Sequence, residues 1–245
     1  MTSRSFRVVG PGRAGGSFAE ALSAAGWRLD GTFGRGVALD DVASDVDVVI
    51  IATPDRAIAE VARAIRPVAA TAIVHLSGAL GLDVLAPHSR RAAVHALMTL
   101  PDARTGAALL RGGWFAIAGD DVAAEVVHAL DGRSFVVADE NRARYHAAAA
   151  VASNHLVVLL GQVERLAASV DVPFAAFLPL IRASVDGVAA LGAQRALTGP
   201  AARGDDETVE RHLLALDETE RPLYRVVSNA ARTLASSVTT PKEDV

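Results

Sequence analysis

One short stretch near the start of the chain limits the fold more than any other. Residues 6–9 form an apolar run, and the turn Gly10-Pro11-Gly12-Arg13-Ala14-Gly15 follows, succeeded by an amphipathic run. In such a GxGxxG turn, the first glycine permits the tight bend, the second leaves space for a phosphate and the third lets a helix lie close to the strand. The N–H groups and the dipole of that helix favour an anion. The stretch predicts a strand, a turn and a helix that bind the pyrophosphate of a dinucleotide.

The composition describes a soluble chain with a large core, because 51% of the 245 residues are hydrophobic and 21% are charged. Cysteine is absent, which excludes disulfides, thiolate metal sites and a cysteine nucleophile and fits a reducing compartment. We therefore expect a cytoplasmic protein without a metal site. Lys242 is the only lysine, so a mechanism that needs a lysine in the core is excluded as well.

The charge pattern and the apolar runs exclude several partners. The net charge of −4 is spread over the chain without a basic block, which favours neither nucleic acid nor an acidic membrane surface. We find no signal-peptide core and no apolar run of the ~20 residues needed to cross a bilayer. We expect a small-molecule substrate and no membrane partner.

The order of apolar runs predicts an α/β protein with two domains. Short β-rich runs alternate with helical ones up to residue 138, which is typical of a doubly wound parallel sheet covered on both faces. From Asp139 the periodicity is helical, so we expect a dinucleotide-binding domain over residues 1–138 and an all-helical domain over residues 139–245. The first helix of that domain should reach about Ala168. Its middle is nearly all apolar and must be buried within the domain or against a second subunit.

The strands and helices of the first domain are expected at definite places. Besides the first, we expect strands at residues 27–33, 47–52, 72–75, 92–95, 114–118 and 134–137. Helices are expected at 58–65 and 122–130, and in the second domain at 180–197, from about 207 and from about 221. Residues 198–205 read as a polar loop and the residues after 236 as a frayed tail.

Two residues compete to select the dinucleotide. Asp30 lies 20 residues beyond Gly10, the spacing expected for a carboxylate that binds the ribose 2′-hydroxyl of NAD. Arg35 falls just past the predicted carboxyl end of the second strand, where the 2′-phosphate of NADP would lie. Position favours Arg35 and NADP, although a solvent-exposed loop arginine remains an alternative. The residues expected to hold the cofactor are Gly10, Pro11, Gly12, Arg13, Ala14, Gly15, Arg35, Thr53 and Pro54.

Candidate catalytic residues come from strand ends and from the long helix. In open parallel sheets the ligand lies beyond the carboxyl ends of the strands. The candidates there are His75, Ser77 and His95, while His146, Ser153 and Asn154 lie within about a third of the circumference of the predicted helix. For each histidine alone a hydrogen-bonded structural role is the alternative, which two histidines at successive strand ends disfavour, and for the helix residues the alternative is helix-to-helix hydrogen bonding. With no usable lysine or cysteine, histidine is the natural proton donor.

The polar loop offers a second set of candidates. Thr198 and Arg203 suit the binding of a substrate carboxylate, although a loop rich in glycine and proline often only turns the chain.

Four stretches carry a family resemblance that covers nearly the whole chain. They are the glycine turn, His75-Leu76-Ser77-Gly78-Ala79, Tyr145-His146 with Ser153-Asn154, and residues 196–205. The sequence resembles the Rossmann-like proteins of the 6-phosphogluconate dehydrogenase-like superfamily that carry a C-terminal domain of unknown function and are related to ketopantoate reductase and pyrroline-carboxylate reductase. The resemblance implies an NADP-type reductase with an active site between its domains, and a homodimer formed through the helical domain.

Two departures limit what the resemblance transfers. Ketopantoate reductases use a lysine one helical turn before an asparagine, and here Ala150 stands four residues before Asn154. His95 is followed by Ala96, whereas the family pattern has a proline after this histidine. The proton donor of those enzymes therefore cannot be carried over.

Three functions follow from the sequence. The first is an NADPH-dependent reductase of a small 2-oxo acid, with 2-dehydropantoate (ketopantoate) reduced to pantoate in pantothenate biosynthesis as the preferred case. The second is a cyclic imine reductase of the pyrroline-carboxylate type. The third is a dinucleotide-binding protein without catalysis, which the missing lysine favours.

Overall fold

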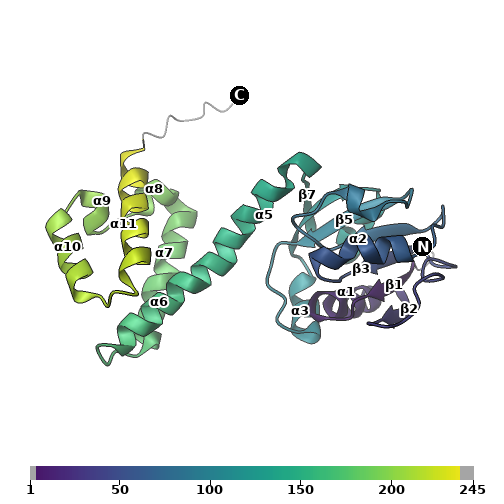
Figure 1. The fold of residues 1–245 in the computed structure, drawn as a ribbon, viewed down its shortest axis with the longest axis horizontal. Helices are drawn as coiled ribbons and strands as arrows, with labels where there is room; N and C mark the ends of the chain where they lie inside the picture. Colours follow the sequence, from purple (N-terminus) through teal and green to yellow (C-terminus); the bar gives the residue numbers. More distant parts are fainter. Residues whose placement is uncertain (1–3, 238–245) are drawn as a thin grey trace. The chain divides into compact units, whose positions relative to one another are not determined.

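The computed structural model describes residues 4–237, and the chain divides into two compact units. The first unit ends at His155 and the second begins at Leu156. The first unit contains a seven-stranded sheet of order β2-β1-β3-β4-β5-β6-β7 (Figure 1). Its strands are β1 (Ser5–Val9), β2 (Arg28–Phe33), β3 (Val48–Ile51), β4 (Ala72–His75), β5 (Arg91–Ala96), β6 (Trp114–Gly119) and β7 (Arg133–Val136).

The predicted doubly wound sheet is confirmed, with one departure at its edge. Strands β1 to β5 run parallel, but β6 pairs antiparallel with β5, and β7 runs parallel to β6. The last two strands thus run opposite to the rest, as antiparallel edge strands often do on such sheets. The helices of this unit are α1 (Arg13–Ala24), α2 (Asp55–Ala64), α3 (Ala103–Leu110) and α4 (Val122–Ala129), with the 3₁₀ turns η1 (Leu82–Leu85) and η2 (Asp139–Asn141).

Alternation along the central strands builds two apolar layers. Val48 and Ile50 of β3 face one layer with Phe18 of α1, while Val49 and Ile51 face the other with the apolar side of α2. All four β3 residues are fully buried, as a parallel strand covered on both faces requires. The helix α3 was not expected from the sequence. The Asp102 side chain begins it by accepting a hydrogen bond from the backbone N–H of Thr105.

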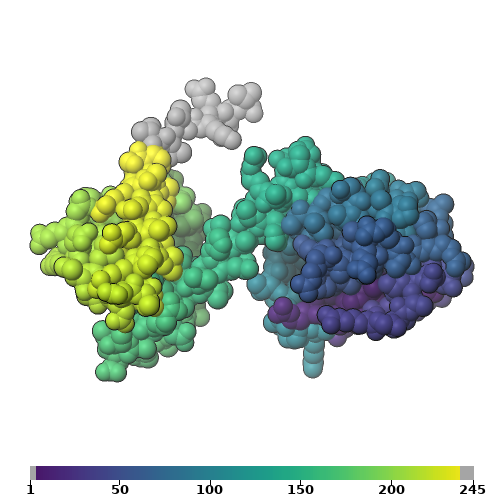
Figure 2. Space-filling view, viewed as in Figure 1, coloured from purple at the N-terminus to yellow at the C-terminus, as the bar shows by residue number. Residues whose placement is uncertain are grey.

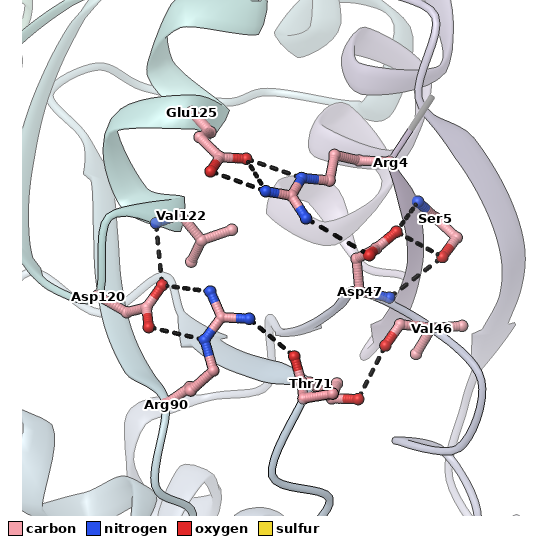
Figure 3. Close-up of polar contacts among 10 residues, drawn as sticks. Arg4, Ser5, Val46, Asp47, Thr71, Arg90, Asp120, Val122 and Glu125 are labelled. Carbon is pink, nitrogen blue, oxygen red and sulfur yellow. Dashed lines mark hydrogen bonds and ion pairs between the residues drawn. The ribbon is translucent and has the colours of Figure 1, made fainter. Parts of the chain in front are cut away.

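Charged side chains close the amino ends of the strands, opposite the glycine turn (Figure 3). The guanidinium of Arg4 binds Glu125 at 2.8 Å and Asp47 at 3.4 Å. The backbone N–H of Ser5 donates to Asp47, and this bond lowers the pKa of the Asp47 carboxyl. Arg90 binds Asp120 through two nitrogens. These contacts join strand starts and α4, so we assign them to the fold rather than to the site.

One continuous helical stretch leaves the sheet and runs into the second unit. It consists of η2, α5 (Arg142–Ala150), the π-helical turn η3 (Val151–His155) and α6 (Leu156–Ala168). The change of sequence character at Asp139 thus precedes the division into compact units, which falls after His155. The side chains of α5 and η3 therefore belong to the first unit, together with the sheet.

The second unit is all-helical, as expected. After α6 it contains η4 (Phe174–Phe177), α7 (Leu178–Leu191), α8 (Ala193–Ala196), α9 (Pro200–Arg203), α10 (Asp206–Ala215) and α11 (Arg221–Ser236). The helix expected over residues 180–197 is broken at Gly192, whose φ of +78° suits glycine. The polar loop contains α9, and Figure 2 shows one face of the surface of this unit, in green to yellow. The tail after Ser237 lies outside the described residues.

Two helical stretches are long and apolar enough to cross a membrane, which the sequence did not lead us to expect. They are Asp139–Ala168 and Phe174–Leu191, and 6% and 0% of their apolar windows are buried. Two such helices are weak evidence for a membrane protein, because helices of soluble proteins meet the same length and composition. The sheet fold of the first unit is that of a soluble protein, so the exposed helix faces need another explanation.

Candidate cofactor site and active site

The three glycines of the turn have different surroundings. Gly10 has a φ of +92°, and a Cβ there would lie 2.9 Å from the carbonyl oxygen of Ala52. A Cβ on Gly15 would lie 2.2 Å from the carbonyl oxygen of Gly10. A Cβ on Gly12 would meet no atom within 4 Å. The fold therefore needs Gly10 and Gly15, whereas the space in front of Gly12 is open for a ligand.

A first cavity of about 720 Å³ extends from the turn to the end of β2. Gly10, Pro11, Gly12, Thr53 and Pro54 line it on one side. Two arginines complete it, Arg35 after β2 and Arg56 near the start of α2. The Oγ1 atom of Thr53 is buried and has no hydrogen-bond partner.

Asp30, the alternative reader of the ribose, lies elsewhere. It sits within β2, does not line the first cavity and forms an ion pair with Arg28 at 3.0 Å. Of the two competing residues, only Arg35 faces the cavity beside the glycine turn.

Two further cavities continue from the glycine turn toward α5. The second, of about 800 Å³, is lined by Gly12, Arg13, Ala14, Thr53 and Pro54 and reaches His95 and Asn154. The third, of about 760 Å³, shares His95 and Asn154 with the second and adds Phe135, Tyr145, His146 and Ser153. The predicted residues His95, His146 and Asn154 thus surround a space made of two adjoining cavities, of which the second also borders the glycine turn.

His95 lies at the centre of this space. Its Nδ1 atom is 2.7 Å from the Oη atom of Tyr145, and the two rings meet edge to face. The centroid of the His146 ring is 5.9 Å from that of His95. A Cβ on Gly78 would lie 2.8 Å from His95 Nε2 and from His146 Cδ2, so only glycine fits between the two rings. Burial lowers the pKa of His95 to about 4, with smaller effects of His146 and Arg142.

His75 and Ser77 lie behind the cavities rather than in their walls. His75 is fully buried, and its Nδ1 accepts a hydrogen bond from the Ser77 N–H at 3.2 Å. The Ser77 hydroxyl donates to Asp55 at 2.7 Å and accepts from the N–H groups of Ala79 and Leu80. Burial lowers the pKa of His75 to about 4. These two residues fix the loop that carries Gly78, so the structure supports a positioning role for them.

Arg142, at the start of α5, is the largest fully buried side chain of the described residues. Its Nη1 donates to the Ser77 carbonyl at 3.4 Å, and its Nε lies 3.4 Å from an Asp139 carboxylate oxygen. The Nε and Nη2 atoms have no hydrogen-bond partner. Burial lowers the pKa of the Arg142 guanidinium, and burial raises the pKa of Tyr145 against the opposing charge of Arg142.

Sequence reasoning did not select Arg142 or Tyr145 as site residues. An arginine in the first turn of a helix reads as solvent-exposed, and no spacing rule reveals that the Ser77 loop covers it. The Tyr145-His146 pair was a usable signal, because it stood among the stretches that carried the family resemblance.

The π-helical turn η3 carries Ser153 and Asn154, two of the three polar residues that the sequence placed on one side of the long helix. The Ser153 hydroxyl bonds to the Ala149 carbonyl and to the Asn154 Oδ1 atom, both at 2.9 Å. The Asn154 side chain lines the second and third cavities. Single π turns within α-helices occur often at functional sites.

Thr198 and Arg203 belong to the second unit. Thr198 precedes α9, and Arg203 ends it. Neither lines the three cavities of the first unit. Among residues 4–237, no group of three His, Cys, Asp or Glu side chains is placed to hold a metal ion.

Two family models match separate stretches of the chain. Residues 28–101 match a Rossmann-like domain, and residues 115–231 match DUF2520, a domain of unknown function. No curated protein matches the sequence significantly.

Solved structures share the fold over nearly the whole chain. A proposed NADP oxidoreductase from Bacteroides fragilis is 21% identical, with a TM-score of 0.78 over 94% of this chain and 98% of that one. A Thermotoga maritima protein is 22% identical, with a TM-score of 0.73 over 94% and 98%. Pyrroline carboxylate reductase from Plasmodium falciparum, solved with NADP bound, is 11% identical, with a TM-score of 0.61 over 96% and 100%.

Proposed function

Because the chain joins a Rossmann-like domain to a DUF2520 domain, we propose that it is an NADP-dependent reductase of a small carbonyl or imine compound. One observation supports this most: the cavity at the glycine turn continues to a space lined by His95, His146 and Asn154. A nucleotide in the first cavity and a substrate beside the histidines would then meet in the second. The structural neighbours named as NADP oxidoreductase and pyrroline carboxylate reductase point the same way.

The residues of the first cavity fit NADP. The open space before Gly12 suits the pyrophosphate, and the unpartnered hydroxyl of Thr53 offers a hydrogen bond to the ligand. Arg35 and Arg56 can both face a 2′-phosphate. When bound, the reduced nicotinamide supplies a hydride, so the protein needs only to orient the acceptor and to provide a proton.

The 2-oxo acid remains our preferred substrate class, with 2-dehydropantoate as its first member. In this proposal a histidine gives the proton, Asn154 holds the carbonyl or carboxylate, and Thr198 and Arg203 bind the carboxylate. The last two lie in the second unit, before and at the end of α9.

A specific observation favours a second candidate, the cyclic imine. Among the described residues, the walls of the third cavity contain no arginine or lysine; its charged or titratable groups are His95, Tyr145 and His146. A substrate that arrives as a protonated imine needs little acid assistance and no cation in the wall. The structural likeness to pyrroline carboxylate reductase supports the same candidate.

Titration with NADPH and NADH followed by a substrate screen tests the function. We expect tighter binding of NADPH and oxidation of NADPH, followed by its absorbance, with either ketopantoate and other 2-oxo acids or cyclic imines. Oxidation with imines only would replace the preferred substrate. Binding of NADPH without turnover of any compound would instead support the third function, a dinucleotide-binding protein without catalysis.

Replacing Arg35 by glutamine is expected to change cofactor preference. Loss of a charge-assisted bond to the 2′-phosphate should weaken NADPH binding by roughly 10- to 100-fold and leave NADH binding within about twofold. Isothermal titration with both nucleotides measures this. Arg63→Gln, an exposed position of α2 outside the cavity, is the control with the same change of charge. A preference of the wild type for NADH would overturn the role of Arg35.

We also propose a cytoplasmic homodimer formed through the helical unit. In the second unit the buried apolar residues are Ala167, Val209 and Leu213, whereas large apolar side chains on α6 and α7 are exposed. Val157 is 67% and Leu180 65% exposed. A second copy of the chain is the partner that would cover such helix faces in a soluble protein.

Light scattering on the purified protein tests the dimer. The wild type should have the mass of two chains, and Val157→Glu or Leu180→Glu should shift it toward one chain. Leu109→Glu, at an exposed position of α3 in the first unit, should leave the mass unchanged. A wild-type mass of one chain would contradict the proposal.

A further inference from the structure

We propose that Tyr145 and His95 form a proton relay, in which His95 hands a proton to the substrate and Tyr145 replaces it, beside the charge of Arg142. The inference rests on the proposed reductase function and goes further than it, because it identifies the donor among the three histidines. All three residues lie in the first unit, so their arrangement is fixed by one compact body.

The hydrogen bond between the two side chains sets the tautomer of His95. The Oη atom of Tyr145 lies 2.7 Å from His95 Nδ1, and the described contacts give Tyr145 no other hydrogen bond. The phenol O–H of Tyr145 makes a hydrogen bond only if it donates to His95 Nδ1. Nδ1 is then the acceptor, and Nε2 carries the hydrogen of the neutral ring. Nε2 lies beside Gly78, and the His95 side chain lines the second and third cavities. In the relay, Nε2 is therefore the nitrogen from which a substrate in these cavities takes its proton.

Arg142 provides a fixed positive charge beside the pair. It lies one helical turn before Tyr145 on α5, and its only recorded ion pair is with Asp139. Two of its nitrogens have no hydrogen-bond partner although the side chain is fully buried. A buried cation with incomplete pairing stabilises a nearby anion strongly, because little water screens it. Its charge acts on Tyr145 and lowers the pKa of that phenol against the effect of burial.

The proposed step balances its protons. A bound reduced nicotinamide would supply the hydride to the carbonyl carbon; as the C=O double bond becomes a single bond, the oxygen takes the proton from His95 Nε2. His95 Nδ1 takes the proton of Tyr145 Oη, which leaves a neutral imidazole and a phenolate that the charge of Arg142 stabilises. Water from the cavity then gives a proton to His95 Nε2 and leaves as hydroxide, and Nδ1 returns its proton to the Tyr145 phenolate, which restores the starting tautomer. His95 stays neutral before and after the step, which agrees with its pKa of about 4.

The groups that act on His95 come from two helices. Tyr145, His146 and Arg142 lie on α5, and Asp55 at the start of α2 acts on it through its charge. His146 is the rival donor, because it lines the third cavity and faces the same side of Gly78. The two donors predict different results for a variant that lacks only the Tyr145 hydroxyl: kcat should fall if the relay operates and stay unchanged if His146 donates the proton directly.

Tyr145→Phe tests the relay, and the chain provides a matched control. Tyr224 on α11 makes an equivalent bond to His212 Nδ1 at 2.6 Å in the second unit, so Tyr224→Phe removes the same hydroxyl from the same kind of pair. We expect kcat with the substrate found in the screen to fall roughly 10- to 100-fold in Tyr145→Phe. KM and NADPH affinity should stay within about twofold, and the control should match the wild type.

Nitrogen-15 NMR of histidine-labelled protein gives a readout that does not depend on turnover. We expect a His95 ring with Nδ1 unprotonated and Nε2 protonated at pH 7, and a shift of the Nδ1 signal in Tyr145→Phe only. A His95 ring protonated on Nδ1, or an unchanged kcat in Tyr145→Phe, would overturn the relay and favour His146. A failure of the proposed reductase function can be told apart from a failure of the relay. In that case the wild type would reduce no compound, although its His95 ring would still show the expected NMR signals.

Discussion

Gly12→Val is expected to weaken NADPH binding by roughly 100-fold or more without lowering the melting temperature. The Gly12 backbone has φ −78° and ψ −160°, a conformation open to any residue, and a Cβ there meets no protein atom within 4 Å. The added methyl groups would therefore occupy the space through which the pyrophosphate approaches the start of α1. A 100-fold loss corresponds to about 2.7 kcal/mol of binding free energy.

Gly15→Ala is the matched comparison within the same turn. Its Cβ would lie 2.2 Å from the Gly10 carbonyl oxygen and 3.0 Å from the Cβ of Ala52. Because the nearest atom belongs to the backbone, α1 must shift, at a cost of roughly 1–3 kcal/mol of unfolding free energy. Thermal unfolding and NADPH titration of both variants separate the two roles. Equal melting losses in the two variants, or full NADPH affinity in Gly12→Val, would contradict the assignment of Gly12 to the ligand.

Much of the first unit follows from local rules. The fully buried run at β3 and the short apolar runs at β4 and β5 predicted strands to within about two residues, because a strand covered on both faces must be apolar throughout. The glycine turn fixed the place of the first cavity, and strand position alone preferred Arg35 to Asp30. The second unit was equally predictable as all-helical, apart from the break at Gly192.

What sequence reasoning missed depends on contacts between distant segments. The reversed direction of β6 leaves no mark on its apolar pattern, since alternation is the same in either direction. The burial of Arg142 arises because the Ser77 loop packs on the start of α5, 65 residues away in the sequence. His75 appeared to be as good a catalytic candidate as His95, and only the packing places it behind the cavity wall while His95 lies within it.

The two buried histidines should make the protein lose stability between about pH 6.5 and pH 4. Each has a pKa of about 4 in the folded chain, lowered from 6.5 chiefly by burial. In this interval the unfolded chain binds more protons than the folded one, so the free energy of unfolding rises with pH. The contribution of the histidines reaches its full value above about pH 6.5. Each histidine accounts for up to roughly 3 kcal/mol. Asp47 and Asp120, whose pKa values lie below 3.8, lose their contribution at lower pH.

Urea unfolding at a series of pH values measures this loss. The variant His75→Gln removes the part of the pH dependence that comes from His75. The variant should be less stable at pH 7, because Gln breaks the bond to the Ser77 N–H, but its stability should fall less steeply toward pH 4. His128→Gln, at an exposed position of α4, should keep the wild-type slope. If His75→Gln also kept that slope, His75 would titrate alike in the folded and unfolded chain. The placement of His75 behind the cavity wall would then be wrong, since a ring in contact with water needs no such shift.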